Sequence, residues 1–422
     1  MLEWLKSRLQ PGFLTFIFVR LAGVGIKPLV LLVAGMAARE PFARDYALLV
    51  SALAGLFVLA GAQTHIPYYN RRFSHMQAAY YKVFRAYFRD TLIQYLLVLP
   101  VVAAIGLLWT RDPVLLAAIV LLVGVEKFFD EDMRHFQFTR EYYDWSTSFA
   151  FRTILPSLAT LAILPFWPGR LIEAYTALSL SSLAGYGVLR HRHFGFYFAL
   201  VGSFVRRGAG NALRRLGAFA IHWRHDLMFN QAWTYASINI LLVDRLMIAN
   251  IYPWQIAEYV FFANIFNLVN VAHSLFYFVP RRPELIKDPN TTAWNELSRR
   301  PNVIPPLGYF AVSLAIAWLT QIMFDTYRDV SPALFFGLGL FYVLQAINLV
   351  GIEFVFWRVS RRKLVLADGG ILLAMAAAIY LLDLPLAAVP YITSLGLVLR
   401  MLLYQWLAKH GARGVQDTTQ AG

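Results

Sequence analysis

Residues 18–32 read FVRLAGVGIKPLVLL, part of an apolar run that begins near Phe13 and is long enough to cross a lipid bilayer. Arg20 and Lys27 are the only charged residues in this stretch, and no carboxylate stands beside them in the sequence. Their spacing corresponds to roughly two helical turns, so both cations share one face. A charge at bilayer depth costs about 3 kcal/mol even on lenient insertion scales, so it usually faces protein or a water-filled cavity. We therefore expect a membrane-spanning helix, kinked at Pro28, whose two cations face a polar cavity.

The composition extends this reading to the whole chain. Hydrophobic residues make up 59% of the 422 residues, only 15% are charged, and the mean hydropathy is +0.54. Soluble domains carry about a quarter charged residues, so the sequence predicts a polytopic membrane protein. The absence of cysteine excludes disulfides, thiolate metal sites and cysteine nucleophiles. No P-loop, HExxH or GxSxG motif occurs in a fitting context, so ATP hydrolysis is not expected. The net charge of +14 is typical of basic cytoplasmic loops, so no nucleic-acid partner is expected. We expect neither an enzyme nor a bound cofactor or metal.

Apolar windows of about 20 residues predict about twelve membrane-spanning helices and an all-α fold. We expect a six-helix half in residues 1–192, a basic cytoplasmic linker in 193–224, and a second six-helix half with a cytoplasmic tail in 225–422. Parallel halves of this kind commonly enclose a central cleft. The predicted spans begin near Phe13, Asp45, Thr91, Pro113, Ser148, Leu171, Asp226, Trp254, Val303, Ser331, Leu364 and Leu386.

The basic residues of the connecting segments are distributed very unequally between the two sides of the predicted membrane. Most of the 38 lysines and arginines fall at the termini and in connections that follow even-numbered spans. The opposite side holds Arg39, Arg44, Arg111, Arg170 and Arg328. The positive-inside rule therefore places both termini in the cytoplasm. The external connections are short, which argues against an enzyme that works on the outer face.

Polar residues inside the spans are candidates for a substrate site. They include Asn239 in span seven, Asn264 and Asn267 in span eight, Asn348 in span ten and Arg400 in span twelve. Each of these is also an ordinary hydrogen-bonding contact between helices. Glu258, Glu353 and Asp368 are candidate carboxylates for ion coupling, and the sequence does not choose among them. Glu126 and Arg152 are expected to snorkel at cytoplasmic ends, and the run EKFFDED at 126–132 to form a solvated cap.

The second half opens with a sequence that resembles a known family. The stretch ASINILLVDRLMIANIYPWQIAEYVFFANIFNLV begins in span seven, where Asp244 and Arg245 are expected near the external end, and Tyr259 follows early in span eight. It is similar to the corresponding region of bacterial polysaccharide and O-antigen flippases of the multidrug/oligosaccharidyl-lipid/polysaccharide exporter superfamily. The opening stretches FIFVRLAGVGIKPLVLLVAGMAARE and DYALLVSALAGLFVLAGAQTHIPYYNRR also resemble the first two spans of that family.

This resemblance implies an alternating-access flippase in the bacterial inner membrane. Its substrate would be an undecaprenyl-diphosphate-linked oligosaccharide, moved from the cytoplasmic to the periplasmic leaflet for surface polysaccharide assembly. Its partners would be membrane lipids and other polysaccharide-assembly membrane proteins. Arg20 and Lys27 would then neutralise the diphosphate or an acidic sugar. Three alternatives stay open: a multidrug or small-molecule exporter of the same fold, a glycan polymerase, and a non-transporting scaffold. The glycan, the coupling ion, the oligomeric state and the subfamily are not readable from the sequence.

Overall fold

The computed structural model describes residues 12–37, 40–57, 59, 95, 98–139, 141–190, 199, 202, 214, 228–278, 295, 297–324, 330–382 and 384–411. These residues are mostly helical, and none of them lies in a strand. Six of the described helices are long and apolar enough to cross a membrane. The prediction of an all-α, polytopic membrane protein is therefore confirmed. The count of twelve spans and the orientation of the termini stay predictions, and the predicted linker at 193–224 lies almost entirely outside the described residues.

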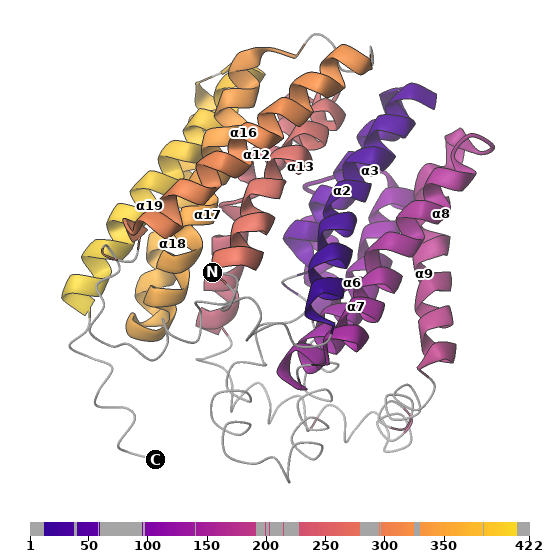
Figure 1. The fold of residues 1–422 in the computed structure, drawn as a ribbon, viewed down its shortest axis with the longest axis horizontal. Helices are drawn as coiled ribbons and strands as arrows, with labels where there is room; N and C mark the ends of the chain where they lie inside the picture. The colour runs from indigo at the N-terminus through magenta and orange to yellow at the C-terminus, as the bar shows by residue number, and fades with distance from the viewer. Residues whose placement is uncertain are drawn as a thin grey trace.

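The first half consists of helices that run roughly alongside one another (Figure 1). The helix with the two cations, α2, begins at Phe13 as the apolar pattern predicts, and Pro28 lies inside it. Between α7 and α8 the chain stays helical but makes one π-helical turn, η4, a feature often found at functional sites. The described elements are α2 (Phe13–Ala37), α3 (Glu40–Leu56), α6 (Pro113–Thr139), α7 (Tyr142–Phe149), η4 (Ala150–Ile154), α8 (Leu155–Ile163), η5 (Pro168–Arg170) and α9 (Leu171–Leu189).

The second half contains five of the six candidate spans. The helix α17 begins where Ser331 Oγ accepts a hydrogen bond from the N–H of Ala333 at 3.3 Å, with Pro332 in the first helical position. Both features are preferred helix starts. The described elements are a helix over 228–239, α12 (Val243–Ile251), α13 (Ile256–His273), η6 (Ser274–Phe278), α16 (Arg300–Met323), α17 (Pro332–Arg358), α18 (Arg361–Leu381), η8 (Leu386–Ala388) and α19 (Val389–Gly411).

Span seven, whose predicted start is near Asp226, is divided into two helices. The chain is helical over 228–239, turns at 240–242 and resumes as α12. At the turn the N–H groups of Leu241 and Leu242 donate to the carbonyls of Ile238 and Asn239, three residues earlier. The Asn239 side chain also bonds back to the Tyr235 carbonyl at 2.9 Å, which competes with regular helix geometry. Asp244 and Arg245 therefore stand in the first turn of a separate helix.

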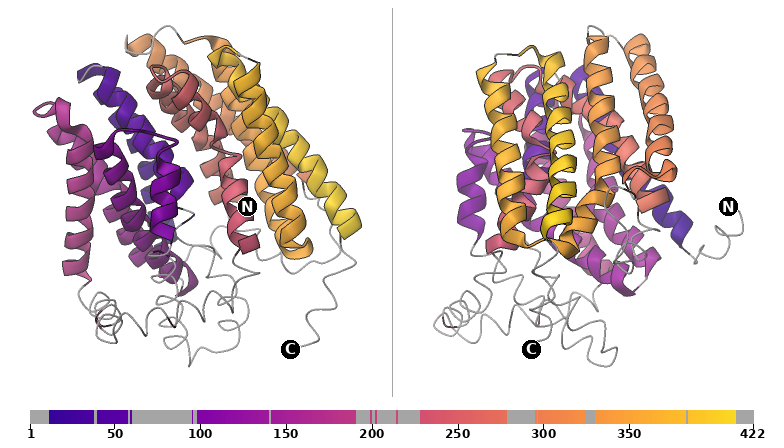
Figure 2. Two further views of the ribbon diagram at one scale, coloured as in Figure 1. Left: turned by 180° about the vertical axis from the view of Figure 1, so that it is seen from behind. Right: turned by 90° about the vertical axis from the view of Figure 1, so that its left-hand side faces the viewer.

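The two halves meet through α13, which packs against α2 and α3 of the first half and against α16 and α17 of the second. The two views in Figure 2 show the helices of each half grouped together, with α13 on the side that faces the first half. One continuous apolar core joins them, and it includes Tyr46 of α3, Phe262 and Phe266 of α13 and Phe335 of α17. Since α13 has partners on both sides, it is the helix on which a site between the halves depends.

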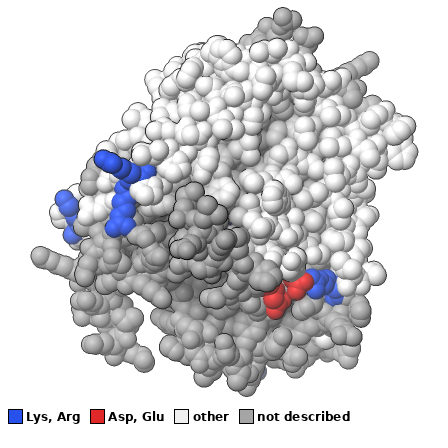
Figure 3. Space-filling view, in the orientation of Figure 1, with Lys and Arg blue, Asp and Glu red and all other residues white. Residues whose placement is uncertain are grey.

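The outward surface of the described helices is largely apolar. The helix α16 exposes most of its length, including Leu307, Leu319 and Ile322, whereas α13 and α17 are mostly buried. On the face in Figure 3, the broad upper part of the described surface carries no Lys, Arg, Asp or Glu. An apolar exterior around a partly polar interior is the distribution expected of helices that face lipid.

Candidate functional site

A cavity of about 360 Å³ lies between the two halves. Residues of α2, α3, α7 and η4 line it from the first half. From the second half it is lined by Ile238, Leu241 and Leu242 and by residues of α12, α13 and α17. Lys27, Asn267 and Gln345 each stand near the middle of their helices, so the cavity lies at mid-depth of the bundle. Its volume falls in the range of sites for small molecules or head groups, about 300–1,000 Å³.

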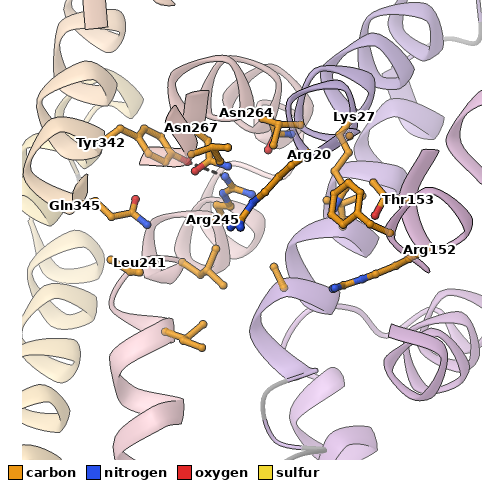
Figure 4. Close-up of a pocket in the computed structure, with 18 residues that line it drawn as sticks. Arg20, Lys27, Arg152, Thr153, Leu241, Arg245, Asn264, Asn267, Tyr342 and Gln345 are labelled. Carbon is orange, nitrogen blue, oxygen red and sulfur yellow. Dashed lines mark hydrogen bonds between the residues drawn. The ribbon is translucent and has the colours of Figure 1, made fainter. Parts of the chain in front are cut away.

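Four cations reach this cavity from both halves (Figure 4). Arg20 and Lys27 come from α2, Arg152 from η4 and Arg245 from α12. The described residues that line the cavity include no aspartate or glutamate. The cavity therefore concentrates positive charge in a part of the protein that is largely removed from water, where an anion is bound most strongly.

Arg20 and Lys27 meet in this cavity, as their spacing on one helical face predicts. Within the part of the chain that the structure describes, neither side chain forms an ion pair or a hydrogen bond. Both are only partly buried, because the cavity exposes them. Two unpaired cations at this depth are costly to maintain, so an anionic ligand is the natural counter-charge.

Contrary to the prediction, the side chains of Arg152 and Glu126 do not snorkel toward the cytoplasmic surface. The Arg152 guanidinium pairs with the Glu126 carboxylate across α6 and η4, and both side chains are partly buried. The π-helical turn places Arg152 and Thr153 on the cavity. Its position in a predicted span was the one signal in the sequence that pointed to this role.

The acidic run at 126–132 likewise differs from the predicted solvated cap. Lys127, Glu131 and Asp132 are buried, and Lys127 pairs with Glu131 one helical turn away. The Tyr186 hydroxyl of α9 donates to the Asp132 carboxylate. The Tyr186–Asp132 hydrogen bond ties α6 to α9, and the Lys127–Glu131 pair lies within α6. None of these groups lines the cavity, so we assign them a structural role.

Asp244, Arg245 and Tyr259, the residues that carry the family resemblance, form a buried network with Tyr342. The Tyr259 hydroxyl donates to Asp244 Oδ2 at 2.6 Å, and Asp244 Oδ1 accepts from the backbone N–H of Arg245 at 2.7 Å. Arg245 Nη2 donates to the Tyr342 hydroxyl at 2.9 Å, and its Nε has no hydrogen-bond partner. The network fixes the Arg245 guanidinium at the cavity. The sequence pointed to the motif but not to the contribution of Arg245 to the cavity.

Uncharged amides from the second half complete the lining. Asn264 and Asn267 of α13 both line the cavity as predicted candidates. Gln345 of α17 lines it too; the sequence marks it as a polar residue of span ten but does not place it among the substrate-site candidates. Asn267 Oδ1 accepts a weak hydrogen bond from Asn270 at 3.5 Å. The sequence does not tell which of the polar residues of span ten reach the cavity, since that depends on how α17 packs against α13.

The structure places the other predicted site residues away from the cavity. Asn239 bonds within its own helix, and Asn348 is buried with both amide atoms unpartnered. Neither lines the cavity, and Glu258 and Glu353 do not line it either. Asp368 and Arg400 pair with each other, with Nε–Oδ1 at 3.1 Å and Nη2–Oδ2 at 2.7 Å, and both are fully buried. This pairing favours a structural role for both.

Gly23 allows α2 to approach α7 at the cavity wall, and it is the basis of a first prediction. A Cβ at Gly23 would overlap the Phe149 ring, whereas a Cβ at Gly25 meets nothing within 4 Å. We expect Gly23→Leu to displace Phe149 into the cavity and to destabilise the fold by about 1–3 kcal/mol. Thermal unfolding of the purified protein measures this, with Gly25→Leu as the matched control. Equal melting temperatures for the two variants would contradict this packing.

No family model matches this chain, and neither a curated protein nor a solved structure matches it.

Proposed function

We propose that this protein is a flippase for a lipid-linked oligosaccharide. It would carry an undecaprenyl-diphosphate-linked glycan from the cytoplasmic to the periplasmic leaflet of a bacterial inner membrane, by alternating access of its two halves. The observation that carries the proposal is the cavity between the halves, with Arg20, Lys27, Arg152 and Arg245 and no lining carboxylate. The resemblance of the sequence around Asp244 and Arg245 to polysaccharide flippases points the same way.

The charge of the cavity suits a diphosphate. Glu126 neutralises Arg152 directly, and the Asp244 carboxylate stands next to Arg245 in the sequence. Arg20 and Lys27 have no carboxylate bonded to them in the described residues, so an anion with about two charges would balance the site. The polyprenyl chain would remain in lipid, where its burial costs nothing.

The break at 240–242 also supports transport. Leu241 and Leu242 line the cavity beside the start of α12. Transporters commonly place interrupted helices at the substrate site, near the middle of the membrane. A multidrug exporter that takes cationic compounds fits less well, because such compounds need lining carboxylates. Glu258 and Glu353 stay candidates for ion coupling. Neither lines the cavity, so they would couple to the substrate from a distance.

Glycan display tests this function directly. We expect a strain that lacks the gene to lose surface polysaccharide and to recover it with the wild-type protein. The Arg20→Ala/Lys27→Ala double variant, at matched membrane expression, is expected to restore less than a tenth of the display, with lipid-linked precursor accumulating in the cytoplasmic leaflet. Arg111→Ala removes an exposed cation outside the cavity and serves as the control. Full display with the double variant would exclude a cationic substrate site.

A further inference from the structure

Cations and amides line different ends of the cavity and meet in its middle. Figure 4 shows Lys27 and Arg152 on one side and Gln345 and Tyr342 on the other, with Arg20, Arg245, Asn264 and Asn267 between them. All of these residues line the same cavity. We call Asn264, Asn267 and Gln345 the amide surface. A ligand that spans the cavity would therefore meet cations at one end and neutral hydrogen-bonding groups at the other.

Two of these amide side chains each have a polar atom without a hydrogen-bond partner in the described residues. Asn264 and Gln345 are 7% and 9% exposed, and among the residues that the structure describes neither Asn264 Nδ2 nor Gln345 Oε1 has a hydrogen-bond partner. Buried polar atoms are nearly always paired, and an unpaired one in a native protein calls for an explanation. Their place in the lining of a cavity explains both, if the missing partners belong to a ligand or to the water that a ligand displaces.

The chemistry of the amides indicates what kind of group they bind. A carboxamide both donates and accepts, and its two polar atoms exchange places when it rotates. A diphosphate only accepts at neutral pH, so it leaves an amide oxygen unpaired. A hydroxyl group donates and accepts, so neighbouring hydroxyls on a ring satisfy both amide atoms.

We infer that the amide surface binds the sugar unit joined to the diphosphate, while Arg20, Lys27 and Arg152 bind the diphosphate itself. This inference rests on the proposed function and assigns the sugar and the diphosphate to different side chains of the cavity. Arg245, held by Tyr342, stands where the two parts meet. Preference for a glycosylated lipid over the bare diphosphate would then reside in α13 and α17.

Binding of two short-chain probes to the purified full-length protein tests this assignment. The probes are farnesyl diphosphate and the same lipid with one N-acetylglucosamine on the diphosphate. The variants Asn264→Leu and Gln345→Met keep the side-chain size and remove the amide. We expect each to bind the glycosylated probe about three- to tenfold more weakly, the effect of losing one hydrogen bond between neutral groups. Affinity for farnesyl diphosphate is expected to stay unchanged.

Controls separate this inference from the proposed function. Asn250→Ala removes an exposed amide outside the cavity and is expected to bind both probes as the wild type does. Because each substitution removes a buried amide atom that has no partner in the described residues, Asn264 Nδ2 or Gln345 Oε1, melting temperatures of Asn264→Leu and Gln345→Met are expected to match or exceed that of the wild type. If the two amide variants bound both probes equally more weakly than the wild type, or bound both as well as the wild type, the sugar assignment would be overturned and the proposed function would stand. Failure of the wild type to bind either probe would overturn both.

Discussion

Replacing Lys27 by glutamate is expected to weaken binding of a polyprenyl-type diphosphate at least a hundredfold. Lys27 stands at the middle of α2 and faces the cavity without a bonded partner in the described residues. One unit charge at about 5 Å contributes about 3 kcal/mol at an effective dielectric constant of about 20. Reversal removes one attraction and adds one repulsion, so even after screening the loss exceeds that of a neutral substitution. Titration of farnesyl diphosphate into the purified protein at low salt measures it.

A graded series distinguishes charge from shape at this position. We expect affinity to fall in the order wild type and Lys27→Arg, then Lys27→Gln, then Lys27→Glu. Glutamate can pair with Arg20 or Arg152, which both reach the same cavity, so the variant is expected to stay folded. Comparable affinities of the glutamate and glutamine variants would contradict the electrostatic role. Glycan display in cells is expected to follow the same order.

Removal of the Asp368 carboxylate is expected to lower the free energy of unfolding more than Gly23→Leu does. Asp368 accepts two hydrogen bonds from Arg400 and a third from the Tyr404 hydroxyl at 2.7 Å. Ser237, on the helix before the span-seven break, accepts a further hydrogen bond from Arg400. Asp368→Ala leaves a fully buried guanidinium without its counter-charge, which costs about 3–5 kcal/mol. Thermal unfolding of the protein in lipid nanodiscs measures the loss.

Removing both charges provides the decisive control for this pair. Replacement of a buried ion pair by apolar groups of similar size is often neutral or stabilising. We therefore expect Asp368→Leu/Arg400→Met to recover most of the stability that Asp368→Ala loses. A single variant as stable as the wild type, or a double variant less stable than the single one, would contradict a structural pair. Retained glycan display in the double variant would also exclude Asp368 as an ion-coupling group.

The sequence by itself determined the class of the fold and the face on which two cations stand. Hydropathy marks the helices because a membrane-spanning segment needs a continuous apolar length and internal backbone hydrogen bonds. The helices α2, α6 and α9 begin at the predicted Phe13, Pro113 and Leu171. Helical periodicity is equally local, so the spacing of Arg20 and Lys27 sufficed to place both on one cavity.

Only the tertiary structure decided which partners these residues have. Arg152 meets Glu126, and Arg400 meets Asp368, from different helices, 26 and 32 residues apart along the chain. Lipid is as apolar as the protein interior, so hydropathy does not reveal which face of a span meets another helix. Tyr342 and Gln345 of α17 reach the cavity and Asn348, about one turn further along nearly the same face, does not, so the extent of the cavity along the helix is also set by the packing. The order of the apolar segments can be read from the sequence, whereas the rotation of each helix about its axis follows from packing against its neighbours.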